Sequence, residues 1–170
     1  AEKDMDGITR GSLAAIYSGR GEGYAPCTAQ SCIEILKHFG IPVAGKRAVV
    51  IGRSLVIGKP VSMLLLNENA TVTTCHSRSE NLPQICREAD IIIAAAGKAA
   101  MVTKEYVKPG QTVLDVGIHV DDEGNMCGDT AFAEIEPIVD AITPVPGGVG
   151  SVTTAILASH VLEAAEKVTK

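Results

Sequence analysis

The sequence predicts an α/β protein, with a doubly wound parallel sheet and helices on both of its faces. Short apolar segments rich in β-branched residues recur along the chain, and helical segments follow most of them. Several of these apolar segments end at a glycine. Strands that alternate with helices join through right-handed crossovers into parallel sheets that are covered on both faces. These observations together predict a Rossmann-like domain.

Residues 1–26 contain many glycines and show little periodicity, which predicts an arm or linker with one short helix over 12–17. The chain starts with Ala1 rather than Met, so we expect it to be a segment of a longer protein. The arm would then continue from a domain further upstream. Residues 27–170 are predicted to form the sheet domain itself.

The sheet domain is expected to open with a helix that has Thr28 as its N-cap and runs to about Phe39, where Gly40 ends it. Strands and helices then alternate. The predicted strands are 47–51, 70–75, 90–96, 112–116 and a last short one over 141–145. The predicted helices are 60–67, 81–88, 131–139 and 152–168, and a β-turn is expected over 121–125.

The composition limits the kinds of partner. The 170 residues carry a net charge of -5 and only 3% are aromatic, which argues against nucleic acid. The five cysteines are odd in number and form no C-x-x-C pair, so we expect buried thiols rather than disulfides or a metal site. No apolar run approaches the length of a membrane span, so we expect no membrane partner.

The most informative segment is Gly52–Pro60, which joins a predicted strand to a predicted helix. A strand that passes through a glycine turn into a helix presents backbone N–H groups and the positive end of the helix dipole. Such an arrangement holds a phosphate. We therefore expect the chain to bind a nucleotide.

Two other interpretations of this segment remain open. The spacing lacks G-x-G-x-x-G, and Gly58-Lys59 resembles the end of a phosphate-binding loop of nucleotide hydrolases. However, five residues rather than four separate the glycines, and Pro60 replaces the Ser or Thr that binds magnesium. The segment is alternatively a glycine turn that only changes the direction of the chain.

The second predicted strand favours one dinucleotide over the other. A carboxylate at the end of this strand would select NAD through its 2′-hydroxyl, whereas an arginine accommodates the 2′-phosphate of NADP. The strand ends in Cys75–Arg78, which contains no carboxylate. Ser77 and Arg78 can bind a phosphate, and Arg53 lies at the neighbouring turn. NADP is therefore favoured, unless Arg78 is a solvated surface charge and Ser77 a helix cap.

Two later segments offer room for the rest of a cofactor. Gly97 and Gly117 follow predicted strands, and small residues there let a ligand approach the backbone. The loop 143–150 contains prolines and glycines with exposed N–H groups, and Ser151 or Thr153 is expected to cap the last helix. This loop fits a nicotinamide carboxamide or ribose. Alternatively, Gly97 and Gly117 only terminate their strands, and the loop 143–150 is only a tight connection between a strand and a helix.

Taken in order, eight segments resemble one family over nearly the whole chain. That family is the bifunctional methylenetetrahydrofolate dehydrogenase/methenyltetrahydrofolate cyclohydrolase, in its NAD(P)-binding domain. The segments are Asp6-Gly7, Pro26-Cys27-Thr28, Gly52–Pro60, Cys75–Arg78, Ala89-Asp90-Ile91, Asp115–Ile118, Gly128-Asp129 and Thr143–Gly150.

The resemblance implies NADP as the cofactor, with NAD less favoured. The cofactor-binding residues that it implies are Gly52, Arg53, Ser54, Ser77, Arg78, Ala96, Gly97, Ile118 and Thr153. The first three would cradle the phosphates and the adenosine end. Ser77 and the two arginines would hold the 2′-phosphate. Ala96, Gly97 and Ile118 would line the cofactor channel, and Thr153 would lie near the nicotinamide ribose.

The resemblance also implies a folate substrate, with Asp6 contacting the folate ring and Pro146 and Gly147 bordering it. The parent enzyme would oxidise 5,10-methylenetetrahydrofolate to the 5,10-methenyl form and hydrolyse that to 10-formyltetrahydrofolate. The family's catalytic lysine and tyrosine belong to an N-terminal domain without a counterpart here, so no catalytic residue is expected in this chain. The alternative is a stand-alone dinucleotide-binding module without catalysis.

Three positions depart from the family's pattern near the folate or the nicotinamide. His119 stands where the family often has Asn, and Ala29 and Ser151 replace usual prolines. The resemblance further implies a homodimer. The cytoplasm is the expected location, with the mitochondrial matrix as an alternative.

Overall fold

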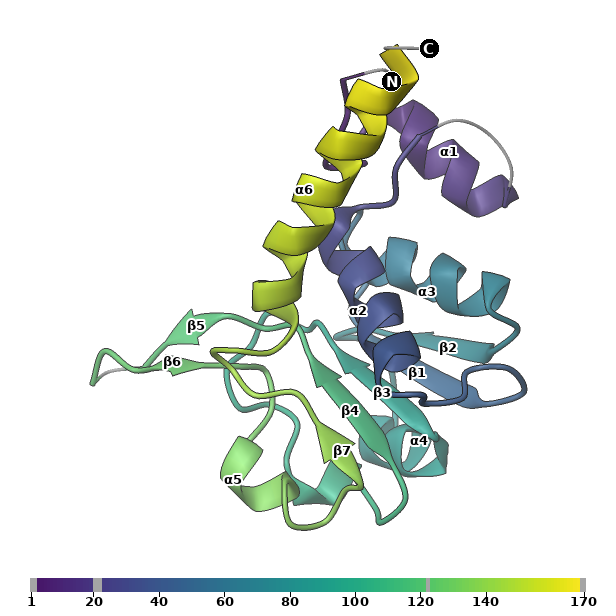
Figure 1. The fold of residues 1–170 in the computed structure, drawn as a ribbon. Helices are drawn as coiled ribbons and strands as arrows, with labels where there is room; N and C mark the ends of the chain where they lie inside the picture. The colour runs from purple at the N-terminus through teal and green to yellow at the C-terminus, as the bar shows by residue number, and fades with distance from the viewer. Residues whose placement is uncertain (1–2, 20–22, 122, 169–170) are drawn as a thin grey trace.

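The computed structural model of the chain describes residues 3–19, 23–121 and 123–168. Its centre is a five-stranded sheet, in which every neighbouring pair is parallel and the order is β2-β1-β3-β4-β7 (Figure 1). The strands are β1 (Arg47–Ile51), β2 (Thr71–Cys75), β3 (Ile91–Ala94), β4 (Thr112–Asp115) and β7 (Ala141–Ile142). This arrangement confirms the predicted Rossmann-like fold.

Helices cover both faces of the sheet (Figure 1). On one face lie α2 (Cys27–His38) and α3 (Gly58–Asn67), and on the other lie α4 (Leu82–Glu88) and the short α5 (Phe132–Ile135). The long α6 (Val149–Val168) packs along α2 and projects beyond the carboxyl edge of the strands.

The alternation of side chains along the strands explains why both faces are covered. Val50, Ile93 and Leu114 belong to the core beneath α2 and α3, whereas Val49 and Ile92 belong to the core beneath α4. Successive residues of a strand point to opposite faces, so an uninterrupted apolar strand needs a helix layer on each side. Each such fully buried side chain stabilises the fold by about 1.5–3 kcal/mol.

Two smaller elements lie outside this core. Helix α1 (Arg10–Ser18) matches the predicted short helix. Its N-cap is Thr9, whose side chain accepts a hydrogen bond from the Ser12 N–H group. A hairpin of β5 (His119–Val120) and β6 (Met126–Cys127) projects from the domain and was not predicted (Figure 1). A short 3-10 helix, η1, covers Lys104–Tyr106.

The β-turn predicted over 121–125 connects the two strands of the hairpin. The Gly124 N–H group donates to the carbonyl of Asp121 over 3.0 Å, which confirms the turn. Asp122 lies outside the described residues. The predicted division into an arm over 1–26 and a domain over 27–170 stays a prediction, and residues 1–2, 20–22 and 169–170 of it also lie outside the described ranges.

Several predicted helix starts were wrong. Helix α2 begins at Cys27, with Pro26 in the N-cap position, so Thr28 lies inside the helix. Helix α6 begins at Val149, whose burial in the core fixes the first turn, so Ser151 and Thr153 are not caps. The Thr153 hydroxyl instead donates to the Val149 carbonyl over 3.1 Å.

Two further expectations also change. Helix α5 ends at Ile135 rather than at Val139. Glu136 still has helical dihedral angles, but Pro137 has no N–H group to continue the hydrogen-bond ladder of the helix. Helix α4 has Asn81 as its N-cap, so Ser77 is not a helix cap.

Within the described ranges, no helix is both long and apolar enough to cross a membrane.

Candidate functional site

The candidate site lies at the carboxyl edge of the sheet, where β1 and β3 are neighbours. The chain runs from β1 to β2 on one side and then crosses to β3 on the other, so the winding reverses between β1 and β3. Ligands bind in the crevice at such a point. Gly52 follows β1 with a φ of 137°, and a Cβ there would lie 2.1 Å from the Ala95 carbonyl oxygen. Only glycine therefore lets the two loops approach this closely.

The loop after β1 presents unused hydrogen-bond donors. Within the described part of the chain, the backbone N–H groups of residues 53–56 donate to no other protein atom. The Ser54 Oγ accepts hydrogen bonds from the N–H groups of Ile57 (3.0 Å) and Gly58 (3.3 Å), and its carbonyl accepts from Lys59 (3.0 Å). The first turn of α3 is thus already satisfied. The loop, rather than the end of the helix, is free to bind a phosphate.

The end of β2 adds polar side chains beside this loop. The Gly52 N–H group donates to the Cys75 carbonyl over 2.9 Å, which fixes the loop against the end of β2. A turn follows β2 and leaves Ser77 and Arg78 exposed. Neither Arg53 nor Arg78 forms an ion pair with a carboxylate of the described residues. Unpaired guanidinium groups and a hydroxyl beside free N–H donors suit an anion with several oxygens.

The loop after β3 differs, because its N–H groups are already bonded. The carboxylate of Asp129 accepts hydrogen bonds from the N–H groups of Ala96 (2.5 Å), Gly97 (3.0 Å) and Lys98 (2.9 Å). The Nε2 atom of His119 lies 2.7 Å from the same carboxylate, which is fully buried. The N–H groups of Ala96 and Gly97 are therefore not available to a ligand.

A second buried carboxylate supports Asp129. Asp115, at the end of β4, accepts from the N–H groups of Gly117 (3.0 Å), Asp129 (2.9 Å) and Thr130 (2.8 Å), and from the Thr130 hydroxyl (2.6 Å). A Cβ on Gly128 would lie 2.1 Å from the Asp115 carboxylate, and one on Gly117 would lie 2.4 Å from that of Asp129. This network was not predicted from the sequence. The available signal was that Gly117 and Gly128 lie close to the two aspartates in the sequence motifs.

A hollow of about 270 Å³ brings three of the predicted residues together. Ile118, Pro146 and Gly147 all line it, between the end of β4 and the loop that leads into α6. Ile118 is 60% exposed and lies beside Gly150, in the first turn of α6. Ile118, which was predicted for the cofactor channel, therefore lies beside the predicted folate border, whereas Ala96 and Gly97 do not line this hollow.

Thr153 and Asp6 lie neither in this hollow nor in the loops after β1, β2 and β3. Thr153 is inside α6, where its Oγ1 accepts a hydrogen bond from the Ser31 hydroxyl of α2 over 3.3 Å. Asp6 is an exposed residue of the arm beside Cys27. Burial, followed by the hydrogen bond with Asp6, raises the pKa of the Cys27 thiol to about 11. Neither Thr153 nor Asp6 lines the hollow.

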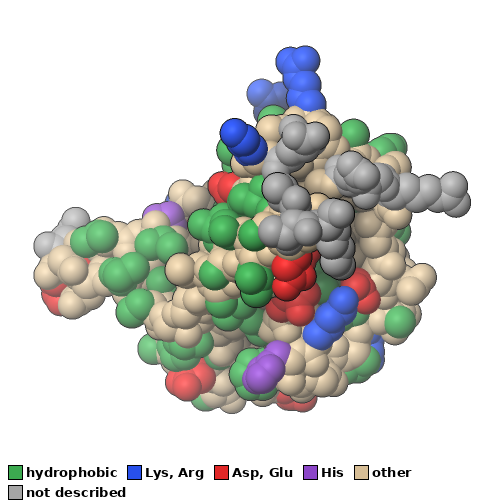
Figure 2. All heavy atoms as spheres, turned by 45° about the horizontal axis from the view of Figure 1, so that its top comes forward, with side chains coloured by type: hydrophobic (Ala, Val, Ile, Leu, Met, Phe, Trp, Pro, Cys, Tyr) green, Lys and Arg blue, Asp and Glu red, His purple; other side chains and the backbone are tan. Residues whose placement is uncertain are grey.

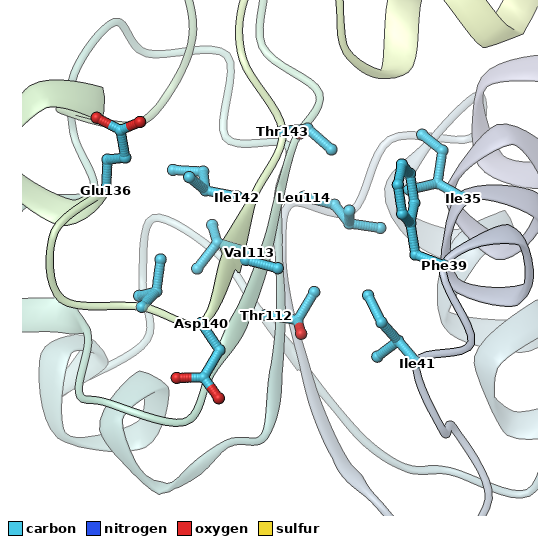
Figure 3. Close-up of a pocket in the computed structure, with 12 residues that line it drawn as sticks. Ile35, Phe39, Ile41, Thr112, Val113, Leu114, Glu136, Asp140, Ile142 and Thr143 are labelled. Carbon is cyan, nitrogen blue, oxygen red and sulfur yellow. The ribbon is translucent and has the colours of Figure 1, made fainter.

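A larger hollow of about 520 Å³ lies on the α2 side of β4 and β7. Ile35 of α2 and Phe39, which follows that helix, stand on one side of it and apolar side chains of the two strands on the other (Figure 3). Its two charged lining residues, Glu136 and Asp140, are both acidic. This hollow contains none of the predicted binding residues and is unsuited to a phosphate, so size alone does not identify the site.

Comparisons with known proteins agree with the geometry. Residues 26–169 match the family model described as tetrahydrofolate dehydrogenase/cyclohydrolase, NAD(P)-binding domain. The chain is 59% identical over 167 residues to the bifunctional protein FolD of Carboxydothermus hydrogenoformans. This match covers 97% of the chain and 58% of that relative.

Solved structures give the same result. A FolD methylenetetrahydrofolate dehydrogenase/cyclohydrolase from Campylobacter jejuni matches with a TM-score of 0.95 and 39% identity, over 97% of this chain and 58% of that one. The Trypanosoma brucei enzyme, which was solved with NADP and an inhibitor, matches with a TM-score of 0.92 and 36% identity, over 99% and 60%. The chain therefore spans less than two thirds of the length of these relatives.

Proposed function

Because the chain belongs to the tetrahydrofolate dehydrogenase/cyclohydrolase family, as its NAD(P)-binding domain, we propose that it holds NADP across the carboxyl edge of its sheet. The observation that carries this proposal is the run of N–H groups over residues 53–56, which have no partner among the described residues. Arg78 likewise forms no ion pair with a described carboxylate. These groups would bind the phosphates of the dinucleotide.

NADP is proposed over NAD because of the side chains at the end of β2. Arg53, Ser77 and Arg78 are exposed and offer donors where the adenosine ribose would lie. No carboxylate occupies the turn over 76–79. A solved relative contains NADP, which is consistent with this preference.

The remaining predicted residues would hold the other end of the cofactor. Ala96, Gly97 and Ile118 would line the path of the nicotinamide, and the hollow beside Pro146 would join it to the folate. Bound NADP supplies the hydride acceptor, and the protein contributes orientation and electrostatics. Thr153 and Asp6 would meet the ligands from outside the hollow.

The proposed activity of the parent protein is the oxidation of 5,10-methylenetetrahydrofolate to 5,10-methenyltetrahydrofolate, followed by hydrolysis to 10-formyltetrahydrofolate. This proposal follows from the relatives, which are named as dehydrogenase/cyclohydrolases. This chain would supply the cofactor half, with catalytic groups from an N-terminal domain of the parent. The chain alone would bind NADP and catalyse neither step.

A homodimer in the cytoplasm is also proposed. Hydrophobic side chains gather on the projecting hairpin (Figure 2), where Val120 and Met126 are exposed. Exposed apolar patches of this kind mark interaction surfaces. Sedimentation velocity of the chain tests this proposal, and a monomer at micromolar concentration would contradict it for the isolated domain.

Calorimetric titration with NADP, NAD and ATP tests the main proposal. We expect binding of NADP to be tighter than that of NAD, and no magnesium-dependent binding of ATP, because Pro60 occupies the position of the metal-binding hydroxyl. Absence of dinucleotide binding would contradict the proposal. Adding the parent's N-terminal domain should give dehydrogenase activity, and failure there would favour a stand-alone binding module.

A further inference from the structure

We propose that Asp129, held by His119, is the positioning residue of the cofactor crevice, because it fixes the loop over 96–98 in the conformation that a dinucleotide needs. The proposal rests on the proposed binding of a dinucleotide and deepens it. Asp129 lies outside the set of predicted contacts. It acts through the backbone of the loop rather than through contact with the cofactor.

The first support is the geometry of the loop. Three consecutive N–H groups, those of Ala96, Gly97 and Lys98, converge on one carboxylate. Convergent backbone N–H groups form a concavity that attracts anions. Because Asp129 fills this concavity, a phosphate cannot bind there. The N–H groups over 53–56, which no described protein atom accepts, are left as the phosphate cradle.

The second support is the way in which the carboxylate itself is held. The Nε2 atom of His119 lies 2.7 Å from Oδ1 of Asp129. A carboxylate only accepts hydrogen bonds here, so Nε2 carries the proton in both the neutral and the cationic imidazole. His119 belongs to β5 of the hairpin, and Asp129 follows β6. The pair therefore joins the hairpin to the loop after β3.

The third support is the contact between this loop and the phosphate cradle. Ala95 immediately precedes residues 96–98, and its carbonyl oxygen lies 2.1 Å from the position that a Cβ on Gly52 would take. The Ala95 N–H group also donates to the Ile51 carbonyl over 2.9 Å. A shift of the loop over 96–98 would therefore change the width of the crevice at Gly52, where the dinucleotide is proposed to cross.

A matched pair of variants at His119 tests the proposal without removing the buried carboxylate. In His119→Gln, a side-chain N–H of similar reach can still donate to Asp129. In His119→Met, a side chain of similar length has no donor. Two quantities are measured for each variant and for the unmodified chain. They are the Kd for NADP and NAD by calorimetry, and the rate of amide hydrogen exchange at residues 96–98.

We expect His119→Met to exchange faster at these amides and to bind both dinucleotides about 10-fold more weakly, with His119→Gln close to the unmodified chain. Unchanged exchange rates in His119→Met would overturn the claim that His119 and Asp129 hold the loop over 96–98. Faster exchange with unchanged Kd would overturn its role in positioning. An equal loss in His119→Gln would also overturn the proposal, because a merely structural hairpin defect is not rescued by a donor. If the unmodified chain binds neither dinucleotide, the proposed function itself fails. The exchange rates still show whether His119 and Asp129 hold the loop over 96–98.

Discussion

Two glycine-containing loops at the same edge of the sheet have opposite hydrogen-bonding states. The loop after β1 leaves the N–H groups of residues 53–56 without protein partners in the described part of the chain. The loop after β3 has the N–H groups of residues 96–98 bonded to the carboxylate of Asp129. In the sequence the two loops look alike, because each follows an apolar strand and starts with a small residue.

The difference shows that a glycine after a strand does not by itself identify an anion site. What distinguishes the loops is whether a buried carboxylate already occupies the concavity of N–H groups. The free loop is suited to a phosphate, and the bonded loop to a fixed wall. The following predictions test this distinction, from the largest expected effect to the smallest.

Gly52→Ala should have the largest effect. The added Cβ would lie 2.1 Å from the Ala95 carbonyl oxygen, and Ala would also have to adopt a φ of 137°. We expect the free energy of unfolding to fall by about 4 kcal/mol. Urea denaturation measures this loss. Gly97→Ala is the matched control, because its φ is also positive (69°) but no atom lies within 4 Å of the added Cβ, and it should cost only about 1 kcal/mol. Equal losses would mean that the close approach of the loops is unimportant.

Asp129→Asn should come next. The amide keeps the shape of the side chain but replaces one accepting oxygen by a donor that faces N–H groups. Because the side chain is fully buried, we expect a loss of about 3 kcal/mol in unfolding free energy, together with faster exchange at residues 96–98. A loss below that of Gly97→Ala would show that the carboxylate does not hold the loop.

Arg53→Ala and Ser77→Ala test the open loop. Each removes a donor proposed for the 2′-phosphate and lies on the exposed surface, so stability should stay within about 0.5 kcal/mol of the unmodified chain. NADP binding should weaken about 10-fold, while NAD binding should change less than about 2-fold. Equal losses for the two cofactors, measured by calorimetry, would remove the 2′-phosphate assignment.

The sequence was sufficient for the fold because the central strands are continuous apolar runs. Val49-Val50-Ile51 and Ile91–Ala94 are buried on both faces, and that pattern requires helices on both sides. The hairpin could not be predicted in the same way, since β5 and β6 have two residues each, too few to show periodicity.

The role of Asp129 could not be predicted because its partners at 96–98 come from a distant part of the chain. Only the fold brings this carboxylate to the loop after β3. The start of α6 was missed for a related reason. Val149 is set by burial in the core, whereas Ser151 and Thr153 are the residue types that local capping rules select.

The smallest effect on stability is expected at Asp4, which serves as a control for the burial of the Asp129 carboxylate. Like Asp129, its carboxylate accepts several hydrogen bonds, from the N–H groups of Ile8 (3.1 Å) and Thr9 (2.8 Å) and from the Ser12 hydroxyl (2.6 Å). Partial burial raises the pKa of Asp4, but these hydrogen bonds outweigh it and hold the pKa well below its usual range. Unlike Asp129, Asp4 lies in a largely solvated arm, so screening by water reduces the value of its bonds.

Asp4→Asn should therefore cost only about 0.5 kcal/mol at pH 7, compared with about 3 kcal/mol for Asp129→Asn. A carboxyl group with a lowered folded-state pKa stabilises the protein above its unfolded pKa of about 4, and that contribution fades as the pH falls toward the folded value. The difference in unfolding free energy between Asp4→Asn and the unmodified chain should thus be largest at pH 7 and shrink below about pH 4, as urea titrations can measure. An effect as large as that of Asp129→Asn would mean that the number of hydrogen bonds, and not burial of the carboxylate, makes the loop after β3 rigid.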